Sequence, residues 1–271
     1  MTQQNTETPN PTFQLDTGAA EIYEAQFVPA IFAHWAPRLV EFAGVAAGHH
    51  VLDVACGTGI VARTARTVAG DAGSVVGVDL NEAMLALAGR VEPAIDWRHG
   101  DAAALPVDDD DFDAVLCQMA FMFFADPVAV VREMGRAARA GGTVAALVPA
   151  ALAEQPAYRP FVDLAVAELG PEARPLLGAY WSCGDLAAFT GRFAEAGLTA
   201  IETSTLTGPA HFDGPEDFVA TEIKGSPLGQ TTDDATIARL GRTVRAEMPE
   251  WLSADGAYDV PLVCHLVRAA A

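Results

Sequence analysis

Basic residues are scarce in this chain. Only 16 of its 271 residues are Lys or Arg, against 36 Asp and Glu, and the formal net charge at pH 7 is −20. Proteins that bind nucleic acid neutralise its phosphates with a basic face. The composition therefore argues against DNA or RNA as a partner, and against tRNA, rRNA or DNA as a substrate. An acid excess of this kind is typical of a well-solvated surface.

Long apolar runs and cysteines are also few. Although 51% of the residues are hydrophobic, no run approaches the ~20 residues that cross a bilayer, so we expect no membrane span. The first fifteen residues are polar and have no basic start, which predicts a disordered leader and no signal peptide. The four cysteines lack the spacing of a metal site, which favours reduced thiols and a cytoplasmic location.

The stretch Val51–Gly59 reads VLDVACGTG and is the most informative part of the chain. Its apolar beginning predicts a strand buried on both faces, in which Asp53 needs a hydrogen-bond partner. Its end predicts a glycine-rich turn into a helix that starts at Ile60. Such a turn lets backbone approach a ligand and leaves free N–H groups at the helix start, but taken alone it is a weak signal.

A carboxylate follows at an informative distance. Twenty residues past Gly59, the apolar run that begins at Ser74 ends at Asp79. In a doubly wound sheet, the acid that ends the second strand lies beside the first turn and can accept hydrogen bonds from a ribose diol. This spacing predicts a ligand that contains a nucleoside. A nicotinamide-dependent dehydrogenase stays open here, although Ala62 stands where its fingerprint prefers a third glycine.

Three motifs in order resemble a known family. VLDVACGTG at 51–59, VVGVDLNEAML at 75–85 and HGDAAALPVDDDDFDAVLCQ at 99–118 are similar to the class I S-adenosylmethionine-dependent methyltransferases. The likeness is to the small-molecule branch of the ubiquinone/menaquinone-biosynthesis type (methyltransferase type 11). It implies an α/β fold with a doubly wound, mostly parallel seven-stranded sheet, Rossmann-like with the last strand antiparallel, and helical lid insertions. It also implies S-adenosyl-L-methionine as cofactor and S-adenosyl-L-homocysteine as product.

The resemblance further implies which residues hold the cofactor. Asp79 would hold the two ribose hydroxyls, and Asp101 would accept from the adenine amino group. Tyr23 would close over the cofactor carboxylate, with a plain core tyrosine as the open alternative. The full implied set is Tyr23, Asp53, Ala55, Gly57, Gly59, Asp79, Leu80, Met84, Asp101, Ala102, Gln118 and Met119.

Residues for the acceptor and for catalysis are less well defined by the sequence. Phe121 and Phe123 follow the fourth expected strand and would either contact a substrate or pack a helix start. A histidine is the usual general base near neutral pH. His34 and His211, which lie in the expected lid segments, are the two candidates. The sequence does not identify either of them as the base. The run Asp108–Asp111 favours a solvated turn over a metal site.

Apolar periodicity predicts strands alternating with helices, which is typical of a parallel sheet covered on both faces. We expect strands near 50–55, 74–79, 95–99, 114–118, 142–148, 198–206 and 260–269, and helices near 59–69, 81–90, 127–139, 161–169, 185–196, 215–224 and 232–249. Gly141-Gly142 should stop the helix over 127–139. Pro29 and Pro37 should break the N-terminal helical segment into two or three helices.

These elements divide the chain into a core and additions. The expected parts are a disordered leader (1–15), an N-terminal helical lid (16–48), the cofactor-binding Rossmann-like core (49–149), an insertion and return to the sheet (150–206), a helical lid insertion (207–259) and the last strand (260–271). Insertions at the carboxyl ends of strands commonly build substrate pockets, so we interpret these additions as a lid.

The leading hypothesis is therefore a methyltransferase that moves a methyl group to O, N or C of a small, apolar metabolite. The alternative is a cofactor-binding protein of the same fold that catalyses a non-methylating reaction such as cyclisation. The sequence leaves the acceptor and the oligomeric state open, a homodimer included.

Overall fold

A seven-stranded sheet organises the protein. In the computed structural model, which describes residues 16–271, the strands lie in the order β3-β2-β1-β4-β5-β7-β6. All run parallel except β7, which is antiparallel to both β5 and β6. The strands are β1 (His50–Val54), β2 (Ser74–Asp79), β3 (Asp96–His99), β4 (Phe112–Gln118), β5 (Ala138–Pro149), β6 (Thr199–Phe212) and β7 (Tyr258–Ala270). The predicted doubly wound, mostly parallel sheet is thus confirmed.

Helices cover both faces of this sheet, because successive strand residues point to opposite sides. Val51 belongs to the core that α2 (Ala33–Phe42) and α3 (Ile60–Ala69) cover. Its neighbour Leu52 belongs to the core under α5 (Pro127–Ala137) and α8 (Leu186–Glu195). Both side chains are fully buried, and each contributes about 1.5–3 kcal/mol of hydrophobic stabilisation. The remaining helix beside the sheet is α4 (Glu82–Val91).

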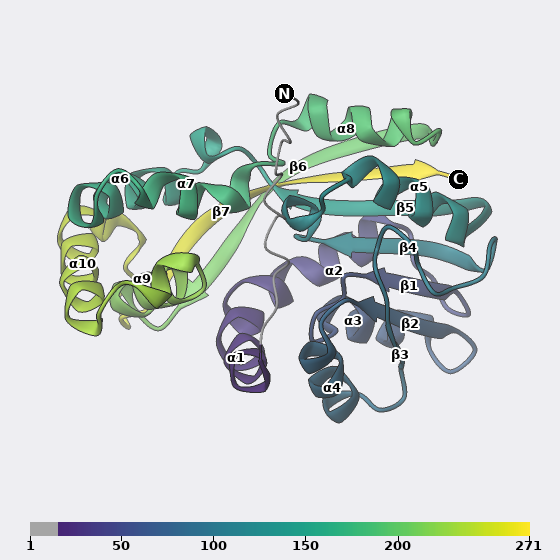
Figure 1. Cartoon of the computed structure of the whole chain (residues 1–271), viewed down its shortest axis with the longest axis horizontal. Coiled ribbons are helices and arrows are strands. Elements are labelled where there is room, and N and C mark those ends of the chain that lie inside the picture. The colour runs from purple at the N-terminus through teal and green to yellow at the C-terminus, as the bar shows by residue number, and fades with distance from the viewer. Residues whose placement is uncertain (1–15) are drawn as a thin grey trace, which may run out of the picture.

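A second lobe is built on the far ends of β6 and β7. These strands continue past the end of β5 as a two-stranded ribbon, in which residues 207–212 pair with residues 258–263. Helices gather around this ribbon (Figure 1). They are α6 (Tyr158–Leu169), α7 (Ala173–Gly178), α9 (Pro215–Lys224) and α10 (Asp234–Glu247). Phe218 of α9 lies at the centre of the lobe, with the rings of Phe161 and Tyr258 4.8 Å and 5.5 Å from its own.

Short 3-10 turns connect several of these elements. They are η2 (Phe121–Phe123), η3 (Leu152–Glu154), η4 (Ala179–Trp181), η5 (Pro227–Gln230) and η6 (Pro249–Trp251). Two of them, η2 after β4 and η4 after α7, lie in contact with each other and bring the sheet and the second lobe together.

The N-terminal segment differs from its prediction. It consists of α1 (Thr17–Ile22), a π-helix η1 (Tyr23–Phe32) and α2, which follow one another without a loop. Pro29 lies inside η1 and Pro37 inside α2. The segment is thus divided into three helical elements, as expected, but neither division falls at a proline. Pro29 lies in the π-helical stretch, whose altered hydrogen bonding accommodates a residue without an N–H donor.

Two boundaries also differ. β6 runs to Phe212 because its residues beyond 206 keep pairing with β7. Helix α5 ends at Ala137, and Gly141-Gly142 lie within β5 instead of stopping the helix. A Cβ on Gly142 would come within 2.8 Å of the Arg139 carbonyl oxygen, at a register shift between β4 and β5. This glycine thus serves a close backbone approach.

The expected disordered leader, residues 1–15, lies outside the described residues. Across residues 16–271, none of the helices combines the length and the apolar character that a membrane crossing requires. The four cysteines are free and buried.

Candidate functional site

The turn after β1 is shaped by one buried carboxylate. Asp53 is 1% exposed, and its Oδ2 accepts a hydrogen bond from the Ala62 N–H at 2.9 Å, in the first turn of α3. Gly57 and Gly59 adopt φ angles of 56° and 89°, a region that favours glycine. Burial raises the pKa of Asp53 to about 8, against the lowering effect of the Ala62 hydrogen bond. Asp53 thus has the hydrogen-bond partner that the sequence required, and this partner is a backbone N–H at the start of α3.

Asp79 at the end of β2 lies beside this turn, as the spacing predicted. Its Oδ2 accepts from the Gly57 N–H at 2.7 Å and its Oδ1 from the Asn81 N–H at 2.8 Å. Asn81 in turn caps α4 through the Met84 N–H. Burial raises the pKa of Asp79, while the backbone hydrogen bonds lower it. The buried Asp53 and the half-buried Asp79 thus converge where β1 and β2 end, an arrangement that a cationic ligand would stabilise in the charged form.

Two of the four non-glycine residues with positive φ in the described part of the chain lie at the same edge. Ala55 and Met119, which follow the neighbouring strands β1 and β4, have φ angles of 55° and 52°. Non-glycine residues in this region cost of order 1–3 kcal/mol each and cluster at functional sites. No sequence pattern predicts this strain, although both residues are among those implied by the resemblance.

Two buried polar atoms at this edge lack partners. Within residues 16–271, Thr58 Oγ1 and Gln118 Oε1 meet no hydrogen-bond partner, although Gln118 Nε2 donates to the Phe32 carbonyl at 3.2 Å. Buried polar atoms are normally satisfied. Unpaired atoms beside a glycine turn fit a polar ligand, and Thr58 is a residue that sequence reasoning missed.

Trp97 on β3 is a second missed residue. A Cβ on Gly77 would collide with its ring, as would a Cβ on Gly59. The indole Nε1 donates to the Glu92 carbonyl at 2.9 Å, which fixes the ring orientation. The ring therefore packs against the glycine turn, and both glycines are needed to make room for it.

Tyr23 approaches the turn from the N-terminal segment. Its ring stacks on Phe27 and Phe32 at 5.9 Å and 5.2 Å, and its hydroxyl would lie 3.7 Å from a Cβ on Gly57. Burial raises the pKa of Tyr23, as do Asp79 and Tyr180 in that order. The next residue, Glu24, pairs with Arg63 of α3 at 2.8 Å and fastens η1 beside the turn.

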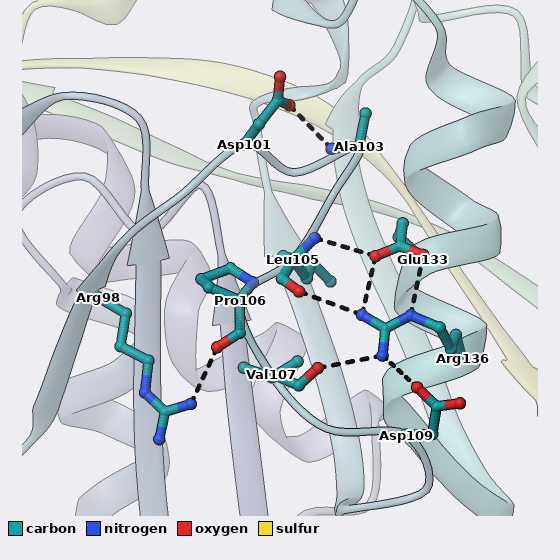
Figure 2. A network of polar contacts seen from close by, with 9 residues as sticks. All are labelled: Arg98, Asp101, Ala103, Leu105, Pro106, Val107, Asp109, Glu133 and Arg136. Carbon is teal, nitrogen blue, oxygen red and sulfur yellow. Dashed lines mark hydrogen bonds and ion pairs between the residues drawn. The ribbon is translucent and has the colours of Figure 1, made fainter.

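The loop after β3, which carries Asp101 and Ala102, is held by α5. Figure 2 shows Arg136 at the centre of this network. Its guanidinium donates to the Leu105 and Val107 carbonyls at 3.2 Å and 3.1 Å. It also pairs with Asp109 at 2.5 Å and with Glu133 at 2.8 Å. Asp109 belongs to the acidic run Asp108–Asp111, which forms the exposed turn that the sequence predicted.

Asp101 stands apart from that network. One carboxylate oxygen accepts from the Ala103 N–H at 2.9 Å, and the other points away from Arg136 (Figure 2). The neighbouring Ala102 is 9% exposed. The loop therefore presents an acceptor oxygen that the protein has already oriented.

Replacing Arg136 with methionine should loosen this loop, because two carbonyls and Glu133 lose their donor while the apolar stem is kept. We expect the free energy of unfolding to fall by about 1–3 kcal/mol. Amide hydrogen exchange over residues 101–109 should become faster. Arg98→Met is the graded control, since Arg98 makes a single 3.1 Å bond to this loop, at Pro106. Equal exchange rates in the two variants would contradict the assignment.

The remaining predicted residues are placed as follows. Met84 is buried and Leu80 is 39% exposed. Phe121 is 1% exposed and packs on Phe189 at 5.0 Å. It therefore faces the core, which favours the alternative that this ring packs the protein interior over contact with a substrate. Phe123 instead meets Tyr180 of η4 edge-on at 6.0 Å.

The surroundings of the two candidate histidines do not favour a role as general base. His211 is exposed, and its Nδ1 lies 2.6 Å from Asp259 across the β6–β7 ribbon. Its neighbours Ala210 and Phe212 are buried, so His211 points to the opposite, solvated face. His34 is partly buried on α2, where its carbonyl accepts from Arg38. The exposed setting of His211 therefore does not favour it as a base.

Comparison with known proteins identifies the family. The model of a methyltransferase domain matches residues 52–146. The chain is 32% identical over 195 residues to a demethylmenaquinone methyltransferase of Shouchella clausii, covering 64% of this chain and 80% of that protein. The chain belongs to the S-adenosylmethionine-dependent methyltransferases. The methyltransferase is also 34% identical over 119 residues to a 2-phytyl-1,4-naphtoquinone methyltransferase of Synechococcus elongatus, covering 42% of its own length and 51% of that relative. It thus spans about half the length of several curated relatives.

Solved structures share the fold of this methyltransferase. The YcgJ protein of Bacillus subtilis superposes with a TM-score of 0.56 at 21% identity, covering 87% of this chain and 97% of the other. A phosphoethanolamine N-methyltransferase of Haemonchus contortus in complex with S-adenosyl-L-methionine gives 0.59 at 18% identity, covering 94% and 57%. These likenesses establish the fold, while the family establishes methyl transfer to a small molecule with S-adenosyl-L-methionine as cofactor. The dehydrogenase alternative is thereby set aside.

Proposed function

We propose that the cofactor lies across the carboxyl ends of β1, β2 and β4. Asp79 and Gly57 hold its ribose side, Asp101 and Ala102 its adenine, and Asp53 with Thr58 its amino-acid end. The unpaired Thr58 Oγ1 and Gln118 Oε1, the strained turns and the converging carboxylates of Asp53 and Asp79 support this placement. The cofactor supplies an activated methyl group whose transfer is an in-line displacement, so the protein's task is mainly positioning.

We further propose that the acceptor is a small hydroxylated aromatic ring. The observation that carries this proposal is a cluster of aromatic side chains between the glycine turn and the second lobe, which we call the aromatic cluster: Tyr23, Phe27, Phe123 and Tyr180. Flat rings stack on such side chains, and aromatic faces favour the cation of a sulfonium. The relatives named as menaquinone and naphtoquinone methyltransferases support a quinol-like ring. The second lobe serves as the lid, and the free cysteines suit a cytoplasmic location.

The test is transfer of labelled methyl from S-adenosyl-L-methionine to a panel of acceptors. We expect label on hydroxylated naphthalenes and benzenes, and little on aliphatic amines or alcohols of similar size. Label on none of the ring compounds would contradict the proposal. Consumption of the cofactor without label in any product would favour the non-methylating alternative.

Alanine substitutions at two adjacent phenylalanines test where the acceptor binds. Phe123→Ala should raise KM for a ring acceptor about tenfold and leave cofactor affinity unchanged, because it removes one stacking surface, worth roughly 1–3 kcal/mol. Phe124→Ala is the matched control, since the Phe124 ring lies edge-on to the core residue Phe121 at 5.2 Å. Equal KM values for the two variants would remove Phe123 from the site.

A further inference from the structure

We propose that Glu222 of α9 is the proton acceptor for the acceptor hydroxyl, an inference that rests on the proposed function. In this step the O–H bond of the ring hydroxyl breaks. The proton moves to a carboxylate oxygen of Glu222, and the electron pair stays on the ring oxygen, which makes the ring a stronger nucleophile. Neither histidine candidate needs to take part.

The first support is position. The Tyr23 hydroxyl lies at the glycine turn, and the Tyr23 ring stacks on Phe27. A Cβ on Gly225 would collide with the Phe27 ring, so that ring packs against the end of α9. Glu222 lies one helical turn before Gly225. The carboxylate therefore stands at the end of the aromatic cluster that is opposite to the cofactor turn.

The second support is the setting of the side chain between two phenols. Tyr180 donates to the Gly225 carbonyl at 2.6 Å, and Glu222 raises the pKa of Tyr180 after burial does. Tyr158 of α6 is 3% exposed and is also close enough to Glu222 for the acid to raise its pKa, again after burial. Within residues 16–271, the Tyr158 hydroxyl meets no partner in hydrogen-bonding geometry. The Tyr158 hydroxyl and the Glu222 carboxylate are close enough to influence each other's pKa, and together they offer a donor and an acceptor to a polar group of a ligand.

The third support is electrostatic. Burial raises the pKa of Glu222 to about 8, and its interaction with Tyr158 lowers it only in part. A general base works best when its pKa is close to the working pH. A cation bound at the glycine turn would favour the carboxylate form. The acid is therefore poised to gain or lose a proton near neutral pH.

The other groups near Glu222 do not titrate in this range. Burial raises the pKa values of Tyr158, Tyr180 and Cys264, the last of which lies on β7 beyond Tyr158, so all three stay neutral at pH 8. Lys224, two residues after Glu222, pairs with Asp234 of α10 at 3.0 Å, and Glu216 at the start of α9 pairs with Arg245 at 2.6 Å. Burial also raises the pKa of Asp53 at the glycine turn to about 8, so a pH dependence with a midpoint near 8 is assigned to Glu222 by its loss in Glu222→Gln.

The test compares Glu222→Gln with the wild type in two measurements. For a ring acceptor that the wild type methylates, wild-type kcat/KM should rise with pH and level off above about 8. Glu222→Gln should lie ~10²–10³-fold lower with no rising limb. Independently of turnover, 2-naphthol titrated into the protein saturated with S-adenosylhomocysteine should bind the wild type about tenfold more tightly at pH 8.5 than at pH 6.5, because a carboxylate accepts a stronger hydrogen bond than a carboxylic acid. Glu222→Gln should bind equally at both pH values.

Controls separate a proton acceptor from a structural residue. Glu216→Gln, on the same helix, should keep the wild-type profile, and Glu222→Asp should keep a rising limb at a lower rate. Glu222→Gln should also keep its affinity for S-adenosylhomocysteine within about twofold, whereas lost affinity would mean that Glu222 is structural and would overturn the inference. A wild-type pH profile in Glu222→Gln would overturn it too. Absence of methyl transfer to any ring refutes the proposed function, and the naphthol titration then decides the role of Glu222: a pH-independent wild type refutes it.

Discussion

Asp79→Ala should weaken binding of S-adenosylhomocysteine by ~1–3 kcal/mol, or about 5- to 150-fold. The carboxylate accepts hydrogen bonds from the Gly57 and Asn81 N–H groups at 2.7 Å and 2.8 Å. It thereby holds the turn beside the place where we position the ribose. Removing it takes away charge-assisted hydrogen bonds, which are roughly twice as strong as neutral ones. Calorimetric titration measures the loss directly.

Two comparisons show whether Asp79 touches the ligand. Asp113→Ala is the matched control, because Asp113 also accepts from a backbone N–H, that of His50 at 2.7 Å, but at the amino end of β1. It should lose stability and keep affinity. With a ligand that lacks the ribose hydroxyls, the cost of Asp79→Ala should shrink. If the cost is the same for both ligands, Asp79 only shapes the turn.

Gly57→Leu should reduce affinity for S-adenosylhomocysteine by about 100-fold or more, which is roughly 3 kcal/mol. The added side chain would project toward the Tyr23 ring, since a Cβ on Gly57 lies 3.7 Å from the Tyr23 hydroxyl. It would fill the space where the cofactor meets the turn. The φ angle of 56° adds about 1–2 kcal/mol of strain for an L-residue.

Gly44→Leu is the control that separates the backbone strain of a leucine at positive φ from the blocking of the cofactor site by its side chain. Gly44 has a φ angle of 73°, and a Cβ there would meet nothing within 4 Å. It follows α2 at the amino edge of the sheet, away from the cofactor turn. Both variants should be folded and comparably destabilised in urea unfolding, but only Gly57→Leu should fail to bind. Full binding by Gly57→Leu would mean that the turn does not line the ligand site.

The placement of Asp79 beside the glycine turn could be predicted from local sequence. Asp79 had to lie beside Gly57 because parallel neighbours β1 and β2 end at the same edge, and twenty residues suffice for the helix between them. Apolar runs, as at Val51 and Leu52, also predicted the buried strands. The lengths of β6 and β7 could not be predicted in this way. Residues 207–212 form a ribbon that depends on its pairing partner and on α9, and no local pattern encodes these contacts.

The acceptor half could not be predicted in the same way. Phe121 and Phe123 are two residues apart in one 3-10 turn, and only the packing of α8 decides that Phe121 faces the core. Glu222 looks like any acid on an amphipathic helix until Tyr158 and Tyr180, from elements more than forty residues away, enclose it. The strain at Ala55 and Met119 is likewise a property of the turn and not of the residue type.

The most direct test is a crystal structure of the protein grown with S-adenosylhomocysteine. We expect the ribose hydroxyls within hydrogen-bond distance of the Asp79 carboxylate, the adenine beside Asp101, and the sulfur facing the aromatic cluster. A ligand bound elsewhere, or bound at this edge with its ribose away from Asp79, would contradict the account.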